Sequence, residues 1–179
     1  PAMDSVVHDE DLGQADAVLV RTNAGAFSSA VAELDAGRRV AIQGGTEELA
    51  SLIRAARTLH AGQRTSHPEL MRFDTWSQVV KEANDHPEDL GQLATFVKLV
   101  ESYDREDGID HMLQLLEQMD DADPQVVVST AHKAKGLEWP RVHIGLDFTP
   151  PQQPEGLPQE AVGDDHAGEQ RLSYVAITR

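Results

Sequence analysis

Short apolar runs alternate with helix-spaced apolar positions in the first part of the chain. AVLV at 17–20 is a continuous apolar run of the kind found in buried parallel strands. Residues 21–37 follow, with apolar positions at helical spacing and with Gly37 as a C-terminal stop. RRVAIQGG at 38–45 then predicts a second strand that ends in two glycines. Because the order is strand, helix, strand, we expect a β-α-β unit within a parallel sheet.

The middle of the chain shows only helical periodicity. Four amphipathic helices are predicted, over residues 46–62, 74–85, 87–103 and 108–119. Thr46 is the expected N-cap of the first helix, and acidic side chains follow it at the positive end of the helix dipole. Since strand patterns flank this stretch on both sides, residues 46–123 are interpreted as an all-helical subdomain inserted into a sheet domain.

The strand pattern returns after the helices. PQVVVST at 124–130 and RVHIGLDF at 141–148 are predicted strands. Residues 149–169, rich in Pro, Gly and acids, are predicted to form a surface loop, and residues 169–179 have the spacing of an amphipathic helix. The expected organisation is an acidic N-terminal tail, a sheet domain in two parts and the helical insert between them, at residues 1–15, 16–45 with 124–179, and 46–123.

The chain is strongly acidic, and the charge is unevenly distributed. It has 31 Asp and Glu against 15 Lys and Arg, a formal net charge of −16. This balance argues against a broad DNA-coating surface, which needs clustered cations. Residues 1–20 carry −5 and residues 101–123 carry −8, whereas residues 129–143 carry +2. A narrow groove that uses a few cations and backbone amides is compatible with this distribution.

Composition excludes several kinds of site and location. The chain has no cysteine, so neither a disulfide nor a thiolate metal site is possible. Its eight histidines lack the spacing of metal ligands, and we predict no metal site. There is no signal-peptide pattern, and no apolar run approaches the length that crosses a bilayer. We expect a soluble, monomeric, cytoplasmic polypeptide without membrane contact, cut out of a longer protein.

A cationic turn follows the predicted strand at 124–130. Parallel sheets bind ligands at the carboxyl ends of their strands, and His132 and Lys133 lie at that end. Such side chains, together with free backbone N–H groups, can hold an anion, and Gly136 allows a backbone to approach closely. The carboxylate of Glu138 can accept a hydrogen bond from a ribose hydroxyl. From composition alone, a turn whose polar side chains only face water explains the pattern equally well.

Four segments carry a family resemblance. STAHKAKGLEW and EQRLSYVAITR resemble motifs V and VI of the superfamily 1 helicases of the UvrD, Rep and PcrA type. VLVRTNAGAF resembles the R-T-N segment on the first strand of the same domain, and AIQGG resembles the second strand with its Gly-Gly end. The order and spacing of the four agree with the family. The short helical insert and the LDF that follows motif V are most similar to the F-box DNA helicase branch and its bacterial relatives.

The resemblance implies an α/β fold with a RecA-like parallel sheet flanked by helices, the second motor domain of a P-loop NTPase, with an inserted helical subdomain. It also implies ATP-dependent 3′→5′ movement along single-stranded DNA, in the bacterial cytosol or nucleoid, with DNA repair among the expected processes. By resemblance, Gly136 and Glu138 lie toward the nucleotide, with Glu138 on the ribose. Arg179 is then the arginine finger, the catalytic residue that reaches the γ-phosphate.

The same resemblance implies a set of contacts to single-stranded DNA. Thr130 and His132 are expected to touch the DNA backbone, with Lys133 beside them in the turn. Asn23 and Arg21 are expected to add backbone contacts from the first strand. The acidic insert is not expected to hold duplex phosphates strongly.

Two elements of a complete ATPase are missing from the sequence. No G-x-x-x-x-G-K-[ST] segment occurs, and no apolar strand ends in the Asp-Glu pair that would hold Mg²⁺. ATP and Mg²⁺ are therefore expected only in the full-length enzyme, where a preceding N-terminal RecA-like domain completes the site, and the isolated chain is predicted to be inactive. The alternative is a non-catalytic helicase-like module that binds proteins or DNA, with the acidic insert as its docking surface.

Overall fold

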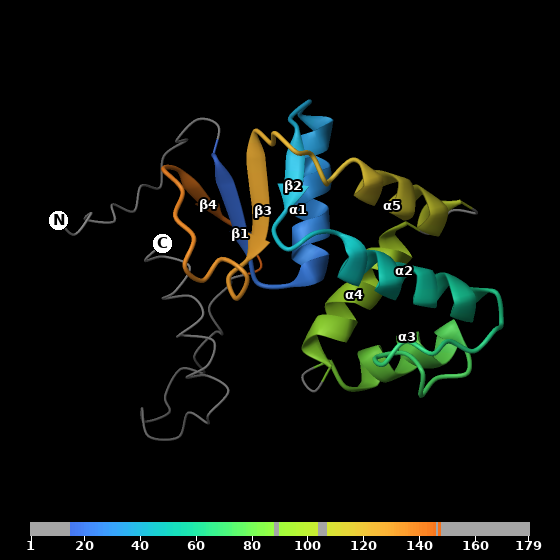
Figure 1. The fold of residues 1–179 in the computed structure, drawn as a ribbon. Coiled ribbons are helices and arrows are strands. Elements are labelled where there is room, and N and C mark those ends of the chain that lie inside the picture. Colours follow the sequence, from blue (N-terminus) through green and yellow to red (C-terminus); the bar gives the residue numbers. More distant parts are fainter. Residues whose placement is uncertain (1–14, 88–89, 104–106, 146, 148–179) are drawn as a thin grey trace, which may run out of the picture.

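The computed structural model describes residues 15–87, 90–103, 107–145 and 147 (Figure 1). The N-terminal tail up to residue 14, the predicted loop at 149–169 and the predicted last helix with Arg179 lie outside the described residues.

Within the described residues, four parallel strands form one sheet, in the order β2-β3-β1-β4. They are β1 (Ala17–Val20), β2 (Val40–Ile42), β3 (Val126–Thr130) and β4 (Val142–Ile144). In the register, Val20 lies opposite Thr130, and Ile42 lies opposite Val128. The predicted α/β fold with a parallel sheet is thereby confirmed.

Helix α1 (Asn23–Asp35) connects β1 with β2 and packs beside the sheet (Figure 1). Its N-cap is Thr22, whose hydroxyl accepts a hydrogen bond from the backbone N–H of Gly25 at 2.9 Å. Phe27 is fully buried. After the helix, Gly37 adopts φ 76°, the left-handed conformation in which glycine often ends a helix.

The four predicted helices are present, and together we call them the helical region. They are α2 (Glu47–His60), α3 (Trp76–Asp85), α4 (Gly91–Ser102) and α5 (Gly108–Glu117). They lie on the β2 side of the sheet, whereas β4 forms the opposite edge (Figure 1). Among the described residues, no helix is long and apolar enough to cross a membrane.

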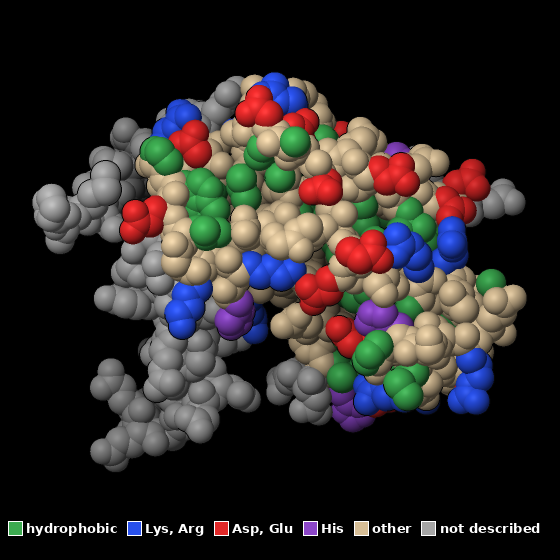
Figure 2. Space-filling view, viewed as in Figure 1, with side chains coloured by type: hydrophobic (Ala, Val, Ile, Leu, Met, Phe, Trp, Pro, Cys, Tyr) green, Lys and Arg blue, Asp and Glu red, His purple; other side chains and the backbone are tan. Residues whose placement is uncertain are grey.

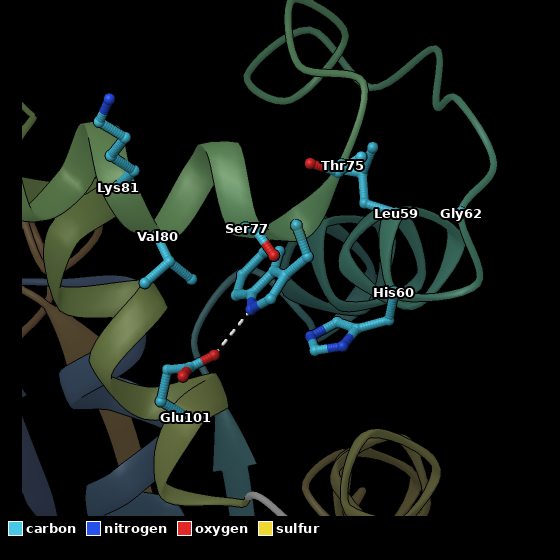
Figure 3. A pocket seen from close by; sticks show the side chains of 9 residues that line it. Leu59, His60, Gly62, Thr75, Ser77, Val80, Lys81 and Glu101 are labelled. Atoms are coloured by element: carbon cyan, nitrogen blue, oxygen red, sulfur yellow. Dashed lines mark hydrogen bonds between the residues drawn. The ribbon is translucent and has the colours of Figure 1, made fainter.

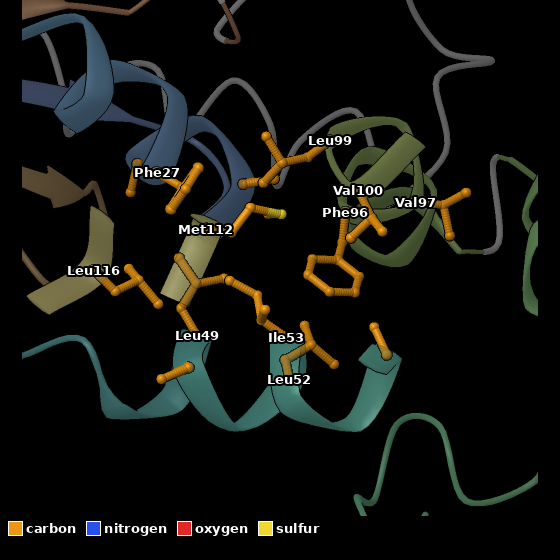
Figure 4. Close-up of a cluster of buried hydrophobic side chains, with 14 of the residues drawn as sticks. Phe27, Leu49, Leu52, Ile53, Phe96, Val97, Leu99, Val100, Met112 and Leu116 are labelled. Atoms are coloured by element: carbon orange, nitrogen blue, oxygen red, sulfur yellow. The ribbon is translucent and has the colours of Figure 1, made fainter. Parts of the chain in front are cut away.

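The helical region shares one hydrophobic core with α1 and the sheet. Phe27 of α1 lies in the same buried cluster as Ile53 of α2, Leu99 of α4 and Met112 of α5 (Figure 4). Phe27 also meets the ring of Tyr103 edge-on, with 5.9 Å between the ring centroids. The first turn of α2 is therefore anchored, through its buried apolar side chains, to the same core that supports β1.

Several predicted boundaries are wrong. The strand expected at 38–45 ends at Ile42, because Gly44 and Gly45 have φ 84° and 83° and the N–H of Gly45 closes a turn onto the Ile42 carbonyl. The strand expected at 141–148 comprises only Val142–Ile144. Thr46 precedes α2, but its backbone is helical and its side chain makes no capping hydrogen bond.

Candidate functional site

The carboxyl ends of the parallel strands bring separate turns to one edge of the sheet. The turn after β1 begins at Arg21, the turn after β2 at Gln43, and the turn after β3 at Ala131. Residues 21–23, 43–45 and 131–138, together with Glu48 and Asp147, are called the carboxyl edge below. Ligands of open α/β sheets bind at this kind of edge.

Two buried alanines hold the turn after β3 in place. Ala131 and Ala134, each 1% exposed, pack with Leu19 of β1 in a small apolar cluster that Trp139 flanks. The N–H of Ala134 donates to the carbonyl of Thr130 at 3.0 Å. The apolar face of the turn is thus fixed to the sheet, and its polar side chains are directed away from that cluster.

The predicted site residues of this turn differ in exposure. Thr130 is only 8% exposed, whereas His132, Gly136 and Glu138 are exposed. Gly136 has φ +86°, a conformation that costs other residues roughly 1–2 kcal/mol. The exposed turn can therefore meet a ligand through His132, while Thr130 offers little surface.

A carboxylate from the helical region joins two turns of the carboxyl edge. Lys133 Nζ donates to Glu48 Oε2 at 2.9 Å, and Asn23 Nδ2 donates to Glu48 Oε1 at 3.4 Å. The hydrogen bond and the charge of Lys133 lower the pKa of Glu48, against a smaller opposing effect of burial. Glu48 is thus a charged bridge between the turns after β1 and β3.

Asp147 organises the turn after β1. Its Oδ2 accepts hydrogen bonds from the backbone N–H groups of Arg21 and Thr22, at 2.9 and 3.1 Å, and from the Thr22 hydroxyl at 3.3 Å. A Cβ at Gly25 would collide with the same carboxylate, so a larger residue there would have to displace Asp147 from these hydrogen bonds. Within the described part of the chain, Asp147 Oδ1 is buried and has no hydrogen-bond partner. The carboxylate fixes the backbone from which Asn23 projects.

The structure brings together some of the predicted site residues. Asn23 and Lys133 meet through Glu48, and His132 lies in the same turn as Lys133. Arg21 is exposed at the end of β1. Arg179 lies outside the described residues, so its position relative to Gly136 and Glu138 stays a prediction.

Sequence reasoning missed the roles of Glu48 and Asp147. Glu48 was expected only to favour the positive end of α2, because its contact to Lys133 spans 85 positions of sequence. Asp147 stood in the LDF segment of the resemblance, which gave no contact for it. A carboxylate near the carboxyl end of a predicted strand could have pointed to Asp147.

A recess lies in the helical region and not at the carboxyl edge (Figure 3). It has a volume of about 560 Å³ and is lined by the end of α2, the start of α3 and the end of α4. His60 stacks on Trp76 with centroids 4.9 Å apart, and Trp76 Nε1 donates to Glu101 Oε1 at 2.7 Å. His60 is twelve residues beyond Glu48, about 18 Å along the helix axis. None of the predicted site residues that the structure describes lines this recess.

The surface charges agree with a localised site. On the face shown in Figure 2, Lys and Arg side chains are scattered among Asp and Glu and form no broad basic patch. Within the described residues, no three His, Asp or Glu side chains are grouped so that they could hold a metal ion. An anion held at the carboxyl edge would be bound by the few donors described above.

Comparison with known proteins identifies the family. The model of the UvrD-like helicase C-terminal domain matches residues 27–179, which include the turn after β3 and the terminal Thr-Arg but not Arg21 or Asn23. F-box DNA helicase protein 1 of Schizosaccharomyces pombe is 29% identical over 147 residues, which are 78% of this chain. They are only 16% of the yeast protein, so the chain spans about one sixth of that relative. With a family match over most of its length and the parallel sheet described above, the chain belongs to the UvrD-like helicase C-terminal domain family.

Proposed function

We propose that this chain is the second motor domain of an ATP-dependent 3′→5′ DNA helicase or translocase. The observation that carries the proposal is the parallel pairing of β1 with β3, which places the Arg21–Asn23 turn beside the turn that contains His132 and Lys133. Both segments resemble the DNA-contacting motifs of the family. The family match supports the motor assignment independently.

Single-stranded DNA is the proposed ligand of these two turns. Exposed His132, with Lys133 and Asn23 beside it, offers N–H donors of the kind that bind phosphate oxygens. Arg21 adds a cation at the end of β1. Thr130 is buried, and its carbonyl already accepts hydrogen bonds from the Ala134 N–H and the Ser129 hydroxyl, so we assign it to the support of the turn, with little contact to the strand. Because so few cations take part, binding is expected to depend only modestly on salt.

The nucleotide is proposed to lie on the other flank of the turn, against Gly136 and Glu138. The left-handed Gly136 allows close approach, and the Glu138 carboxylate would accept a ribose hydroxyl. This sequence has no P-loop, so the group that holds the phosphates and Mg²⁺ would belong to the N-terminal RecA-like domain that the family resemblance implies. Arg179 would reach across that interface and stabilise charge on the transferring phosphoryl group.

The test is DNA-stimulated ATP turnover by the full-length enzyme. Arg179→Ala should lower turnover by on the order of 10³, the scale of arginine fingers in phosphoryl transfer. Binding of an oligo(dT) strand should change little, because the finger faces the nucleotide. Arg54→Ala is the matched control, since Arg54 is exposed and, among the described residues, forms its ion pair with Glu47 of the same helix.

Two results would contradict this proposal. The first is turnover by the isolated chain above an Arg179→Ala control, because half a site should not hydrolyse ATP. The second is full activity of the Arg179→Ala enzyme. Strand displacement on substrates with a single 3′ or 5′ tail tests the polarity separately.

The alternative function is a non-catalytic module that binds proteins or DNA. The Glu48 bridge favours it, because it engages two of the side chains assigned to DNA. A full-length protein that binds oligo(dT) but shows no ATP turnover would support a DNA-binding module. Absence of both activities would support a protein-binding one.

A further inference from the structure

The contact of Glu48 with two predicted DNA ligands has a consequence for strand binding. Glu48 Oε2 takes one donor of Lys133, and Oε1 takes one donor of Asn23. These donors belong to turns that follow different strands, 110 positions apart in the chain. A phosphate of a bound strand would approach the same nitrogens, so the carboxylate and the phosphate compete for them.

The position of Glu48 is set by the packing of α2. The residues that follow it, Leu49 and Ala50, are buried, and Ile53 one turn later is fully buried in the core shared with α1. The helix therefore presents the carboxylate to the carboxyl edge from a firmly held backbone. Glu47, one position earlier, turns to Arg54 of its own helix at 2.8 Å.

The carboxylate carries full charge at neutral pH. Lys133 lowers the pKa of Glu48, and the hydrogen bond from Asn23 acts in the same direction. The negative charge offsets the cation nearest to it and repels an incoming phosphate. Both effects weaken strand binding at the same atoms.

We propose that Glu48 is an internal competitor of the DNA backbone, a carboxylate that must leave Lys133 and Asn23 when a phosphate of the single strand takes their donors. The inference rests on the proposed function, because it takes the strand to be the ligand of these two turns. Since Glu48 belongs to α2, strand binding then also releases a link between the helical region and the sheet. A translocating motor needs weak, repeatedly broken contacts, and such a competitor keeps the contacts weak.

The experiment compares Glu48→Gln with Glu47→Gln in the full-length enzyme. Both changes remove one negative charge from the first turn of α2, but only Glu48 contacts Lys133. Dissociation constants for a fluorescent oligo(dT) strand are measured over a series of KCl concentrations. Glu48→Gln should bind about threefold more tightly at low salt, the effect of freeing one exposed ion pair. The slope of the logarithm of its affinity against the logarithm of the salt concentration should steepen by up to about 0.7, the value for one further neutralised phosphate on a single strand.

A Lys133→Ala background separates competition from a structural role. There, Glu48→Gln should have little effect, because the main donor for which it competes is gone. If Glu48 only stabilised α2, the Glu48→Gln variant would bind oligo(dT) more weakly, and its affinity would not depend more steeply on salt.

The outcomes distinguish the two proposals. If Lys133→Ala weakens oligo(dT) binding but Glu48→Gln behaves like Glu47→Gln, the competitor role is overturned and the DNA-binding role stands. If the wild-type protein does not bind oligo(dT), or Lys133→Ala binds as tightly, the DNA assignment of this turn fails and the competitor role fails with it.

Discussion

The helical region and the carboxyl edge each use a glutamate to join elements that are distant in sequence, but in different surroundings. Glu101 of α4 accepts the indole N–H of Trp76, a residue 6% exposed beside a continuous apolar core. Glu48 accepts from Lys133 and Asn23, which are only partly buried. The first contact ties a buried ring to α4 at the edge of the apolar core, through a glutamate that is itself exposed. The second contact holds side chains whose hydrogen bonds a ligand can take over.

This difference separates stability from binding. In the helical region, apolar burial supplies the stabilisation, and polar contacts satisfy the few donors that burial isolates. At the carboxyl edge, left-handed glycines and exposed polar side chains contribute little burial. Substitutions in the first region should therefore change unfolding, and those in the second should change ligand binding.

The largest expected effect on stability is that of Phe27→Ala. Phe27 is fully buried between the sheet and the helical region, and its loss should lower the free energy of unfolding by about 3–5 kcal/mol. Urea denaturation measures the change, with Ser28→Ala, exposed on the same helix, as control. A loss below about 1 kcal/mol would mean that α1 and the helical region do not share a core.

A smaller effect is expected at Glu101. Glu101→Ala leaves the Trp76 N–H without its acceptor, which should cost on the order of 1–2 kcal/mol of unfolding free energy. Glu101→Gln keeps an acceptor oxygen and should cost less. Equal unfolding free energies for the two variants would show that the hydrogen bond contributes nothing. Neither variant should change oligo(dT) affinity.

Gly136→Ala tests the carboxyl edge directly. The left-handed backbone should cost about 1 kcal/mol, although open space surrounds the added methyl group. Relief of this strain would distort the turn, so the KM for ATP of the full-length enzyme should rise. Gly91→Ala is the control, because Gly91 begins α4 with an ordinary φ and also has open space around it. An unchanged KM for ATP would show that Gly136 does not contact the nucleotide.

The smallest expected effect belongs to the ion pair of Asp16 with Arg141, at 2.8 Å beside the starts of β1 and β4. The hydrogen bond from Arg141 lowers the pKa of Asp16 below its ordinary value of 3.8. Because the folded-state pKa is the lower one, the stabilisation is present above pH 3.8 and is lost as the pH falls through the folded-state pKa. Asp16→Asn should thus be slightly less stable at pH 7.

Urea denaturation of both proteins over a pH series checks this sign. The difference in unfolding free energy should shrink toward zero as the pH drops below 3.8. A difference that is constant with pH would show that the charge of Asp16 plays no part.

Local patterns predicted the elements better than their ends. AVLV and VVVST became strands, since continuous β-branched and apolar runs suit a sheet buried on both faces. The strand predicted for AIQGG ends early, because the two glycines form a turn and do not pair with the neighbouring strand. Thr46 had the sequence of an N-cap, but its helical backbone keeps its side chain out of the capping position.

The residues of the candidate site could be predicted from the sequence only where they belong to a recognisable motif. His132, Lys133 and Gly136 were found because they follow a strand within one short segment. The bridge from Lys133 to Glu48 depends on how α2 packs against the sheet, which no local pattern contains. The burial of Thr130 likewise follows from its place at the end of a central strand and could not be read from its residue type.

Hydrogen exchange of the full-length enzyme with and without oligo(dT) tests the central claim most directly. The claim is that the carboxyl edge binds the single strand and that the helical region supports it. We predict slower exchange of backbone amides at residues 21–24 and 131–136 with the strand bound, and no change at residues 75–81 beside the recess of Figure 3. Protection confined to residues 75–81, with none at the two strand-end turns, would contradict the account.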